Sequence, residues 1–266
     1  MAATRYSAPT HAAAYAAAAA RAHAEVPYYR ERDARAGAPD TAAPLPADRL
    51  DRHYHELFPL GAPWRGEPDP PAWLPDGADL AAALALTGRH RPGTPVFELR
   101  PALLDLRLPG GPYRVLLTAA ADVDPTAPDP RPPQRAAFAA TRPATLLGPP
   151  DDLARLAGAV DTAGALVLPV LPLAAARADP GRPALLYDEH LGWAGAWSAE
   201  CGRAHLSWRA LFAGGTPEGL LLTRLHRRRP TLVDVRPDGT AGLGVAACPR
   251  HGTPVVGPAG ECPPNT

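Results

Sequence analysis

Apolar residues in the first third of the chain follow helical spacing. The Ala-rich run 10–24 predicts the clearest helix, because Ala has the highest helix propensity and Thr10 is placed to cap its start. Pro27 is predicted to end that helix, with one short turn after it. Two further helices are predicted over 48–58 and 78–86, and Pro-rich segments separate them.

From about residue 94 the apolar runs become short and are divided by Pro-Gly and Gly-Gly pairs, which is typical of strands and turns. Continuously apolar strands indicate a parallel sheet that is covered on both faces. Such strands are predicted at 144–148, 165–172 and 183–188, with helices at 132–141 and 151–160. Other strands are predicted at 94–100, 103–108, 113–120 and 219–225, and a hairpin turning at Pro237-Asp238-Gly239 is predicted over 231–246.

These elements together predict an α/β protein with three parts. Residues 1–40 form an N-terminal helical arm, and residues 41–196 form the α/β core. Residues 197–266 form a β-rich subdomain that contains paired Cys and His residues.

The basic residues are biased in a way that excludes some chemistry. All 27 are Arg, and the chain contains no Lys and no Ile, which is typical of codon usage in a GC-rich bacterium. A phosphate-loop lysine, a Schiff base and a lysine that stabilises an adenylate all need an ε-ammonium group. Arg cannot replace Lys as a nucleophile, because it stays protonated.

Charge and cysteine content limit the partners and the compartment. Acidic and basic residues balance at 27 each, so we expect no nucleic-acid partner. No apolar run reaches the roughly 18–20 residues that span a bilayer, so we expect no membrane segment. Three cysteines do not make a disulfide framework, which favours the cytoplasm.

Two short Cys/His pairs predict a metal site. Cys201 and His205 are separated by three residues, and Cys248 and His251 by two. Zinc takes four N or S ligands at tetrahedral positions, so the two pairs predict a closed, structural zinc site, with Gly202 and Gly252 allowing the backbone to bend. Cys262 could displace one histidine. The alternative is that both cysteines are buried thiols and both histidines are ordinary polar groups.

A polar cluster follows the predicted strand 183–188. Its members are Tyr187, Asp188, Glu189 and His190, and α/β proteins place ligand sites at this edge of the sheet. His190 with an acidic neighbour could act as a general acid or base if the side chains converge. Trp193 and Trp197 could wall an apolar pocket. The alternative is a polar loop capped by core tryptophans.

Several segments, in order, resemble the phenylacetate–CoA ligase branch of the adenylate-forming enzymes. They are the Val26-Pro27-Tyr28-Tyr29-Arg30-Glu31-Arg32 motif and residues 140–158, 187–192, 219–236 and 248–252. The resemblance covers most of residues 15–256. It implies an adenylate-forming α/β core, and it strengthens the zinc prediction because some members carry a metal knuckle near residue 248.

The chain also departs from that family where the family's chemistry lies. The phosphate loop would fall on Thr87, Gly88, Gly93 and Thr94, without its lysine, and a plain turn is the alternative. Leu191 stands where the family has a glutamate that holds Mg²⁺. The family's C-terminal lid has no counterpart either. We therefore do not expect ordinary adenylation with ATP and Mg²⁺.

Two functions are compatible with these residues and motifs: the polar cluster at 187–190 favours the first, an enzyme or small-molecule binder, and the lost phosphate loop favours the second, which is the alternative. The first is a protein of specialised metabolism that binds or transforms a small carboxylate, an aromatic acid or an acyl thioester, with residues 187–190 as working groups. The second is a non-catalytic, zinc-stabilised scaffold or partner of another biosynthetic protein. A homodimer is compatible with both.

Overall fold

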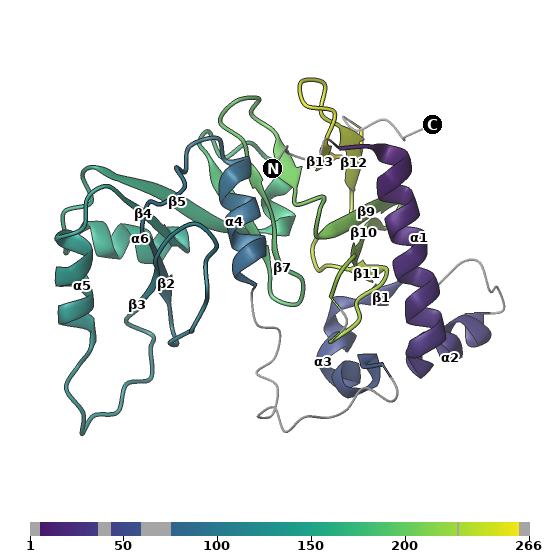
Figure 1. Cartoon of the computed structure of the whole chain (residues 1–266), viewed down its shortest axis with the longest axis horizontal. Coiled ribbons are helices and arrows are strands. Elements are labelled where there is room, and N and C mark those ends of the chain that lie inside the picture. Colours follow the sequence, from purple (N-terminus) through teal and green to yellow (C-terminus); the bar gives the residue numbers. More distant parts are fainter. Residues whose placement is uncertain (1–5, 37–43, 60–75, 228, 261–266) are drawn as a thin grey trace.

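The structure is a computed structural model that describes residues 6–36, 44–59, 76–227 and 229–260. It is a mixed α/β protein with two mixed sheets (Figure 1). The larger sheet has nine strands in the order β12-β13-β8-β7-β6-β5-β4-β2-β3, and the smaller has four in the order β1-β11-β10-β9.

The bounds of the elements are as follows. The helices are α1 (Ala8–Glu25), α2 (Pro27–Ala36), α3 (Leu50–His53), α4 (Gly77–Leu86), α5 (Arg131–Ala139) and α6 (Pro150–Ala157), with 3₁₀ turns at Ala47–Arg49, Tyr54–Leu57 and Leu173–Arg177. The strands are β1 (Leu45–Pro46), β2 (Val96–Arg100), β3 (Tyr113–Leu117), β4 (Ala144–Gly148), β5 (Ala165–Pro172), β6 (Ala184–Asp188), β7 (Gly192–Trp197), β8 (Ala204–Leu206), β9 (Leu211–Thr216), β10 (Gly219–Arg224), β11 (Val235–Arg236), β12 (Leu243–Ala247) and β13 (Pro254–Pro258).

The predicted Ala-rich helix is confirmed as α1, but it starts earlier than expected. Ser7 is the N-cap, and Thr10 lies in the first turn, where its backbone amide and hydroxyl both donate to Ser7 Oγ. The prediction that Thr10 caps the helix was therefore wrong. The helix ends where Val26, held extended by the following Pro27, turns the chain into α2.

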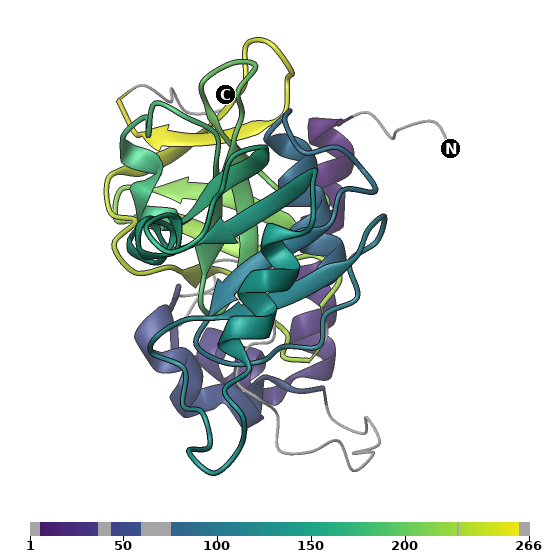
Figure 2. The ribbon, with the colours of Figure 1, turned by 90° about the vertical axis from the view of Figure 1, so that its left-hand side faces the viewer.

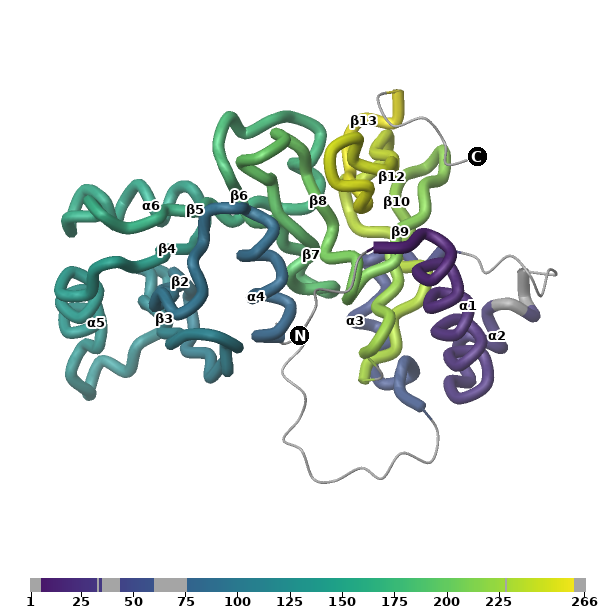
Figure 3. The backbone as a smooth tube through the Cα atoms, turned by 45° about the horizontal axis from the view of Figure 1, so that its top comes forward, coloured from purple at the N-terminus to yellow at the C-terminus, as the bar shows by residue number. Residues whose placement is uncertain are grey.

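Helix α1 covers the four-stranded sheet. The Tyr15 ring stacks on Phe212 of β9 at a centroid distance of 4.3 Å, and His11 Nε2 lies 3.1 Å from the carbonyl oxygen of Leu211. Figure 3 shows α1 and α2 side by side at one end of the molecule, with α5 and α6 at the other. The N-terminal arm therefore packs on strands from the last quarter of the chain.

The predicted helix 48–58 is broken into α3 and two flanking 3₁₀ turns. Its apolar residues still point inward, and Leu50 and Leu57 are fully buried in the same core. The predicted helix 78–86 is confirmed as α4, which Asp76 caps by accepting a hydrogen bond from the amide of Ala78 at 2.6 Å.

The predicted parallel sheet is confirmed. Strands β3, β2, β4, β5 and β6 are neighbours in that order and all run parallel. Side chains of β2 alternate between two cores: Val96 packs with α4 on one face, and Phe97 packs with α5 and α6 on the other. Figure 2 looks at this half of the molecule, with α5 in front of the strands. Burial on both faces explains the continuous apolar runs.

Residues 103–108 do not form the predicted strand. Leu106 and Leu108 instead pack against the core beneath α4, whereas Leu103 is 71% exposed. The alternating pattern therefore comes from a loop that buries two of its leucines against the sheet. A side chain can be buried in this way without its backbone pairing with another strand.

The predicted hairpin over 231–246 was also wrong. Strand β11 pairs with β10 and β1 in the small sheet, whereas β12 pairs with β13 in the large one. The turn at Pro237-Asp238-Gly239 thus carries the chain from one sheet to the other. Strand β13, which begins and ends with proline, was not predicted, so the true partner of β12 was missed.

The large sheet continues across residue 196, where the α/β core was predicted to end. Strand β7 pairs with β6 on one side and with β8 on the other, both antiparallel. The parallel half and the strands that carry the Cys/His pairs are therefore parts of one sheet.

Tyr29 joins the N-terminal arm to the chain near β11. Its side chain is 1% exposed, and its hydroxyl donates to the carbonyl oxygen of Thr231 at 2.7 Å. The hydroxyl oxygen of Tyr29 also accepts a hydrogen bond from the amide of Val233 at 3.0 Å. Burial raises the pKa of Tyr29, so the hydroxyl keeps the proton that it donates.

We expect Tyr29→Phe to lower the free energy of unfolding by about 2 kcal/mol, since it removes two buried hydrogen bonds of the Tyr29 hydroxyl. Urea unfolding followed by circular dichroism measures the change. Tyr6→Phe is the matched control, because it keeps the edge contacts of the Tyr6 ring with His11 and Trp208. Equal losses in both variants would contradict the role of the Tyr29 hydroxyl.

Candidate metal centre

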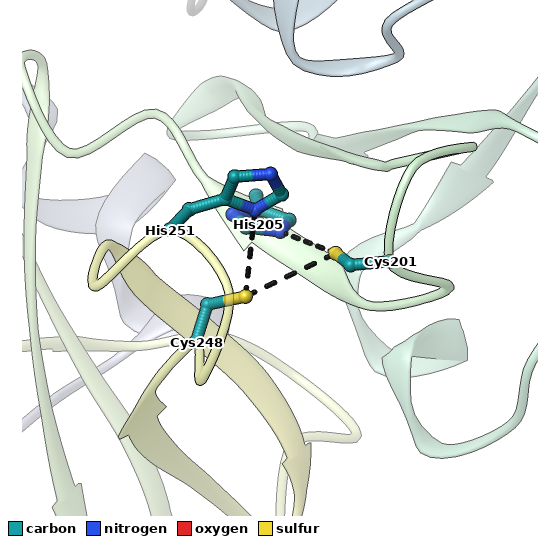
Figure 4. Close-up of side chains that lie close together, drawn as sticks. All are labelled: Cys201, His205, Cys248 and His251. Atoms are coloured by element: carbon teal, nitrogen blue, oxygen red, sulfur yellow. Dashed lines mark hydrogen bonds between the residues drawn. The ribbon is translucent and has the colours of Figure 1, made fainter.

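Two neighbouring hairpins of the large sheet carry the four predicted metal ligands. Cys201 lies in the turn between β7 and β8, and His205 lies on β8. Cys248 and His251 lie in the turn between β12 and β13. Strand β13 pairs with β8, with Val255 opposite His205, so the two hairpins lie side by side and their ligands face one another (Figure 4).

The local turns are set by glycines and backbone hydrogen bonds. Gly202 and Gly252 have φ angles of 60° and 68°, in the left-handed region that glycine adopts without strain. The amide of Cys248 donates to the carbonyl of Thr253 at 2.8 Å, and the amide of Gly252 donates to the carbonyl of Cys248 at 2.7 Å. The expectation that these glycines bend the backbone at the pairs is confirmed.

The four ligand atoms lie close enough together for one ion to contact them all. All lie within 4.8 Å of one another. Cys201 Sγ is 2.9 Å from His205 Nε2, Cys248 Sγ is 3.5 Å from His251 Nδ1, and the two sulfurs are 3.9 Å apart. A zinc ion with Zn–S near 2.3 Å and Zn–N near 2.0–2.1 Å spaces its ligands roughly 3.3–3.8 Å apart. The cluster could therefore bind a metal such as zinc.

Each histidine is oriented by a group behind it. His205 Nδ1 lies 2.9 Å from Thr253 Oγ1, and His251 Nε2 lies 3.3 Å from Glu200 Oε2. When these outer nitrogens donate, Nε2 of His205 and Nδ1 of His251 keep free lone pairs that face the cysteines. Metal-binding histidines need this tautomer arrangement.

Burial and charge also suit a cation. Cys248 and His205 are each 2% exposed. Burial, together with the nearby His251, lowers the pKa of His205 to about 4, so its imidazole is neutral and can coordinate. Burial, assisted by Cys248, raises the pKa of the Cys201 thiol. A bound dication would favour the thiolate form of both cysteines instead, because its positive charge stabilises two adjacent thiolates.

The two predicted pairs thus lie together in one cluster that could hold a metal. The sequence pattern did not reveal Glu200 and Thr253, which lie directly before Cys201 and two positions after His251. Their places beside the ligands in the sequence were the available signal. Cys262, the suggested alternative ligand, lies outside the described residues.

The polar cluster at 187–190 converges only in part, because His190 and Glu189 approach each other while Asp188 closes a turn. Asp188 Oδ1 accepts from the amides of His190 and Leu191 at 3.0 and 2.9 Å, which closes the tight turn between β6 and β7. His190 is buried, with Nε2 3.4 Å from Asp51 and Nδ1 3.9 Å from Oε1 of the exposed Glu189. The alternative of a polar loop fits this arrangement.

Tyr187 faces a different set of groups from its three neighbours. It is half-buried beside Arg100, and its pKa is raised, chiefly by burial. Arg100 also pairs with the buried Glu98 at 2.7 Å, and Glu98 accepts a hydrogen bond from the hydroxyl of Tyr113. Glu98, placed in an otherwise apolar run, was not predicted as part of any site.

The two tryptophans do not share a pocket. Trp193 packs beneath α4, and Trp197 packs in the core beneath α1, so they belong to different hydrophobic clusters. The cause is a β-bulge: Leu186 pairs with Gly195 but Tyr187 pairs with Trp193, so Ala194 is an extra residue that reverses the alternation. The expected pocket wall was therefore wrong.

The expected phosphate loop is a plain turn. The amides of Thr87, Gly88, Gly93 and Thr94 all donate to backbone carbonyls, so they are not free to bind an anion. Thr87 also follows the C-terminus of α4, where the helix dipole is negative and repels phosphate. Leu191, at the position of the family's magnesium ligand, is fully buried.

No family model matches this chain, and the comparison with curated proteins also finds no match. The resemblance to phenylacetate–CoA ligases therefore stays a prediction. Of the helices in the described ranges, none combines the length and the apolar character needed to cross a lipid bilayer.

We expect Thr253→Val and Glu200→Gln each to weaken zinc binding by about 10–100-fold, since each removes a group that orients a metal-binding histidine. Competition with a chromophoric chelator measures the affinity. Thr126→Val and Glu218→Gln are matched controls, because both side chains are exposed and lie on other loops. Unchanged affinity in the first two variants would contradict the assigned roles.

Proposed function

We propose that this protein is a zinc-stabilised scaffold on a ligase-like plan, and that it serves as a non-catalytic partner of another biosynthetic protein. The observation that carries the proposal is the cluster of Cys201, His205, Cys248 and His251, whose ligand atoms lie within 4.8 Å of one another. One ion held there would join two hairpins at the end of the large sheet.

The position of the cluster supports a structural role for a bound metal. Strand β12 is the edge strand of the large sheet, and β13 next to it makes a register of only two residue pairs with β8. A short pairing contributes little stability by itself. A zinc ion that binds both turns would act as a cross-link, and its binding free energy would add to the stability of the fold.

The scaffold proposal is favoured over the small-molecule proposal because the residues of the latter are occupied elsewhere. Asp188 closes a turn, and the two tryptophans belong to separate cores. Adenylation would also need a lysine, and the chain has none. The ligase-like ancestry rests on the order of the sequence motifs.

We expect Cys201→Ser and Cys248→Ser each to reduce bound zinc from one ion per chain to nearly none. Metal content after dialysis, measured by mass spectrometry, tests this. Zinc at a free concentration of about 1,000 times its Kd stabilises the fold by about 4 kcal/mol, so its loss lowers Tm by roughly 8–16 °C. Cys262→Ser is the control and should keep both zinc and Tm. Undiminished zinc in the first two variants would end the proposal.

We expect ATP with Mg²⁺, an acyl-CoA and aromatic acids to leave the Tm of the zinc-loaded protein unchanged. Thermal shift at millimolar ligand provides the measurement, and a pyrophosphate assay with ATP and each acid accompanies it. A clear stabilisation by any of these ligands would favour the small-molecule proposal, and pyrophosphate release would restore adenylation.

A further inference from the structure

The four metal ligands differ in how firmly the fold holds them. His205 lies on a central part of the large sheet, with β7 on one side and β13 on the other, and is 2% exposed. Cys248 is equally buried and is fastened through its backbone amide and carbonyl. The side chain of His251 is 29% exposed and lies at the tip of its turn. His251 is therefore the ligand that leaves most easily.

A cleft of about 260 Å³ opens beside the two imidazoles. Ala85 and Leu86, at the end of α4, line it on one side, and Glu200 lines it with His205 and His251. Gly88 also lines the cleft, where a Cβ atom would lie 3.2 Å from the side chain of Glu200. A small molecule in this cleft would reach the position that His251 occupies around the ion.

We propose that the zinc site binds a small thiol in this cleft, in exchange for His251. This rests on the proposed zinc binding, because the ion is what the thiol would contact. The thiolate forms one metal–sulfur bond, the metal–Nδ1 bond of His251 breaks, and the thiol proton passes to solvent. Cys201, His205 and Cys248 stay bound. The ion then has three protein ligands and one exchangeable position, which is the arrangement of zinc sites that bind a water or substrate.

The lining of the cleft favours a thiol over other donors. Zinc that already has two cysteine ligands accepts sulfur readily. A carboxylate would enter past Glu200 already charged, whereas a thiol enters neutral and loses its proton only at the ion. Its alkyl part would then contact Ala85 and Leu86, the apolar side of the cleft.

The test uses the full chain loaded with Co²⁺, because zinc has no visible spectrum. Titration with 2-mercaptoethanol should raise the sulfur-to-cobalt charge-transfer absorption about 1.5-fold, as a third thiolate joins two. Ethylene glycol, which has a hydroxyl in place of the thiol, should leave the spectrum unchanged. His251→Ala should keep the cobalt and bind 2-mercaptoethanol at least about 10-fold more tightly, since no side chain competes for the position.

Ala85→Phe provides a second variant, because Ala85 is an exposed residue at the wall of the cleft and is not one of the four ligands. It should keep the cobalt spectrum and weaken the thiol response about 10-fold or more. An unchanged wild-type spectrum at saturating thiol, with cobalt still bound, would overturn the exchange and leave the zinc proposal intact. Loss of cobalt on adding thiol would overturn it as well. Failure of the chain to bind either metal would instead overturn the zinc proposal itself.

Discussion

The pairing of β13 with β8 is the contact on which the metal centre depends. It places Val255 opposite His205 and joins a hairpin that ends near residue 258 to one that begins near residue 192. Without it, the two Cys/His pairs would have no reason to meet, since strands β9, β10 and β11 between them belong to the small sheet. A metal ion and a strand pairing therefore support one another: the pairing presents the ligands, and the ion would hold a short register in place.

The parts of the fold that could be predicted from sequence are those decided by local preference or by burial on both faces. The Ala-rich helix and the parallel strands at 144–148, 165–172 and 184–188 belong here, because their patterns leave few alternatives. The hairpin at 231–246 failed for a different reason. Its strands have partners far away in the sequence, and a tight turn between two strands does not show that they pair with each other.

The site shows the same division. Short Cys/His pairs indicated the metal cluster, because their spacing alone restricts which residues can reach one ion. Trp193 and Trp197 gave a misleading signal, since a single extra residue at Ala194 decides which core each tryptophan joins. Glu200 and Thr253 act through contacts with histidines and leave no spacing pattern of their own. The polarity of α4, which places Thr87 at a helix C-terminus, likewise emerges only when the helix bounds are known.

The docking of α1 on β9 has a consequence for how the chain is made. His11 meets Leu211, a partner 200 residues later in the sequence. At a synthesis rate of about 5–20 residues per second, the ribosome needs roughly 10–40 s to produce that partner. During that interval the strands on which α1 packs have not been synthesised, so the apolar side of α1 stays exposed. The nascent protein therefore depends on α1 avoiding contact with other chains until the last quarter of the chain emerges.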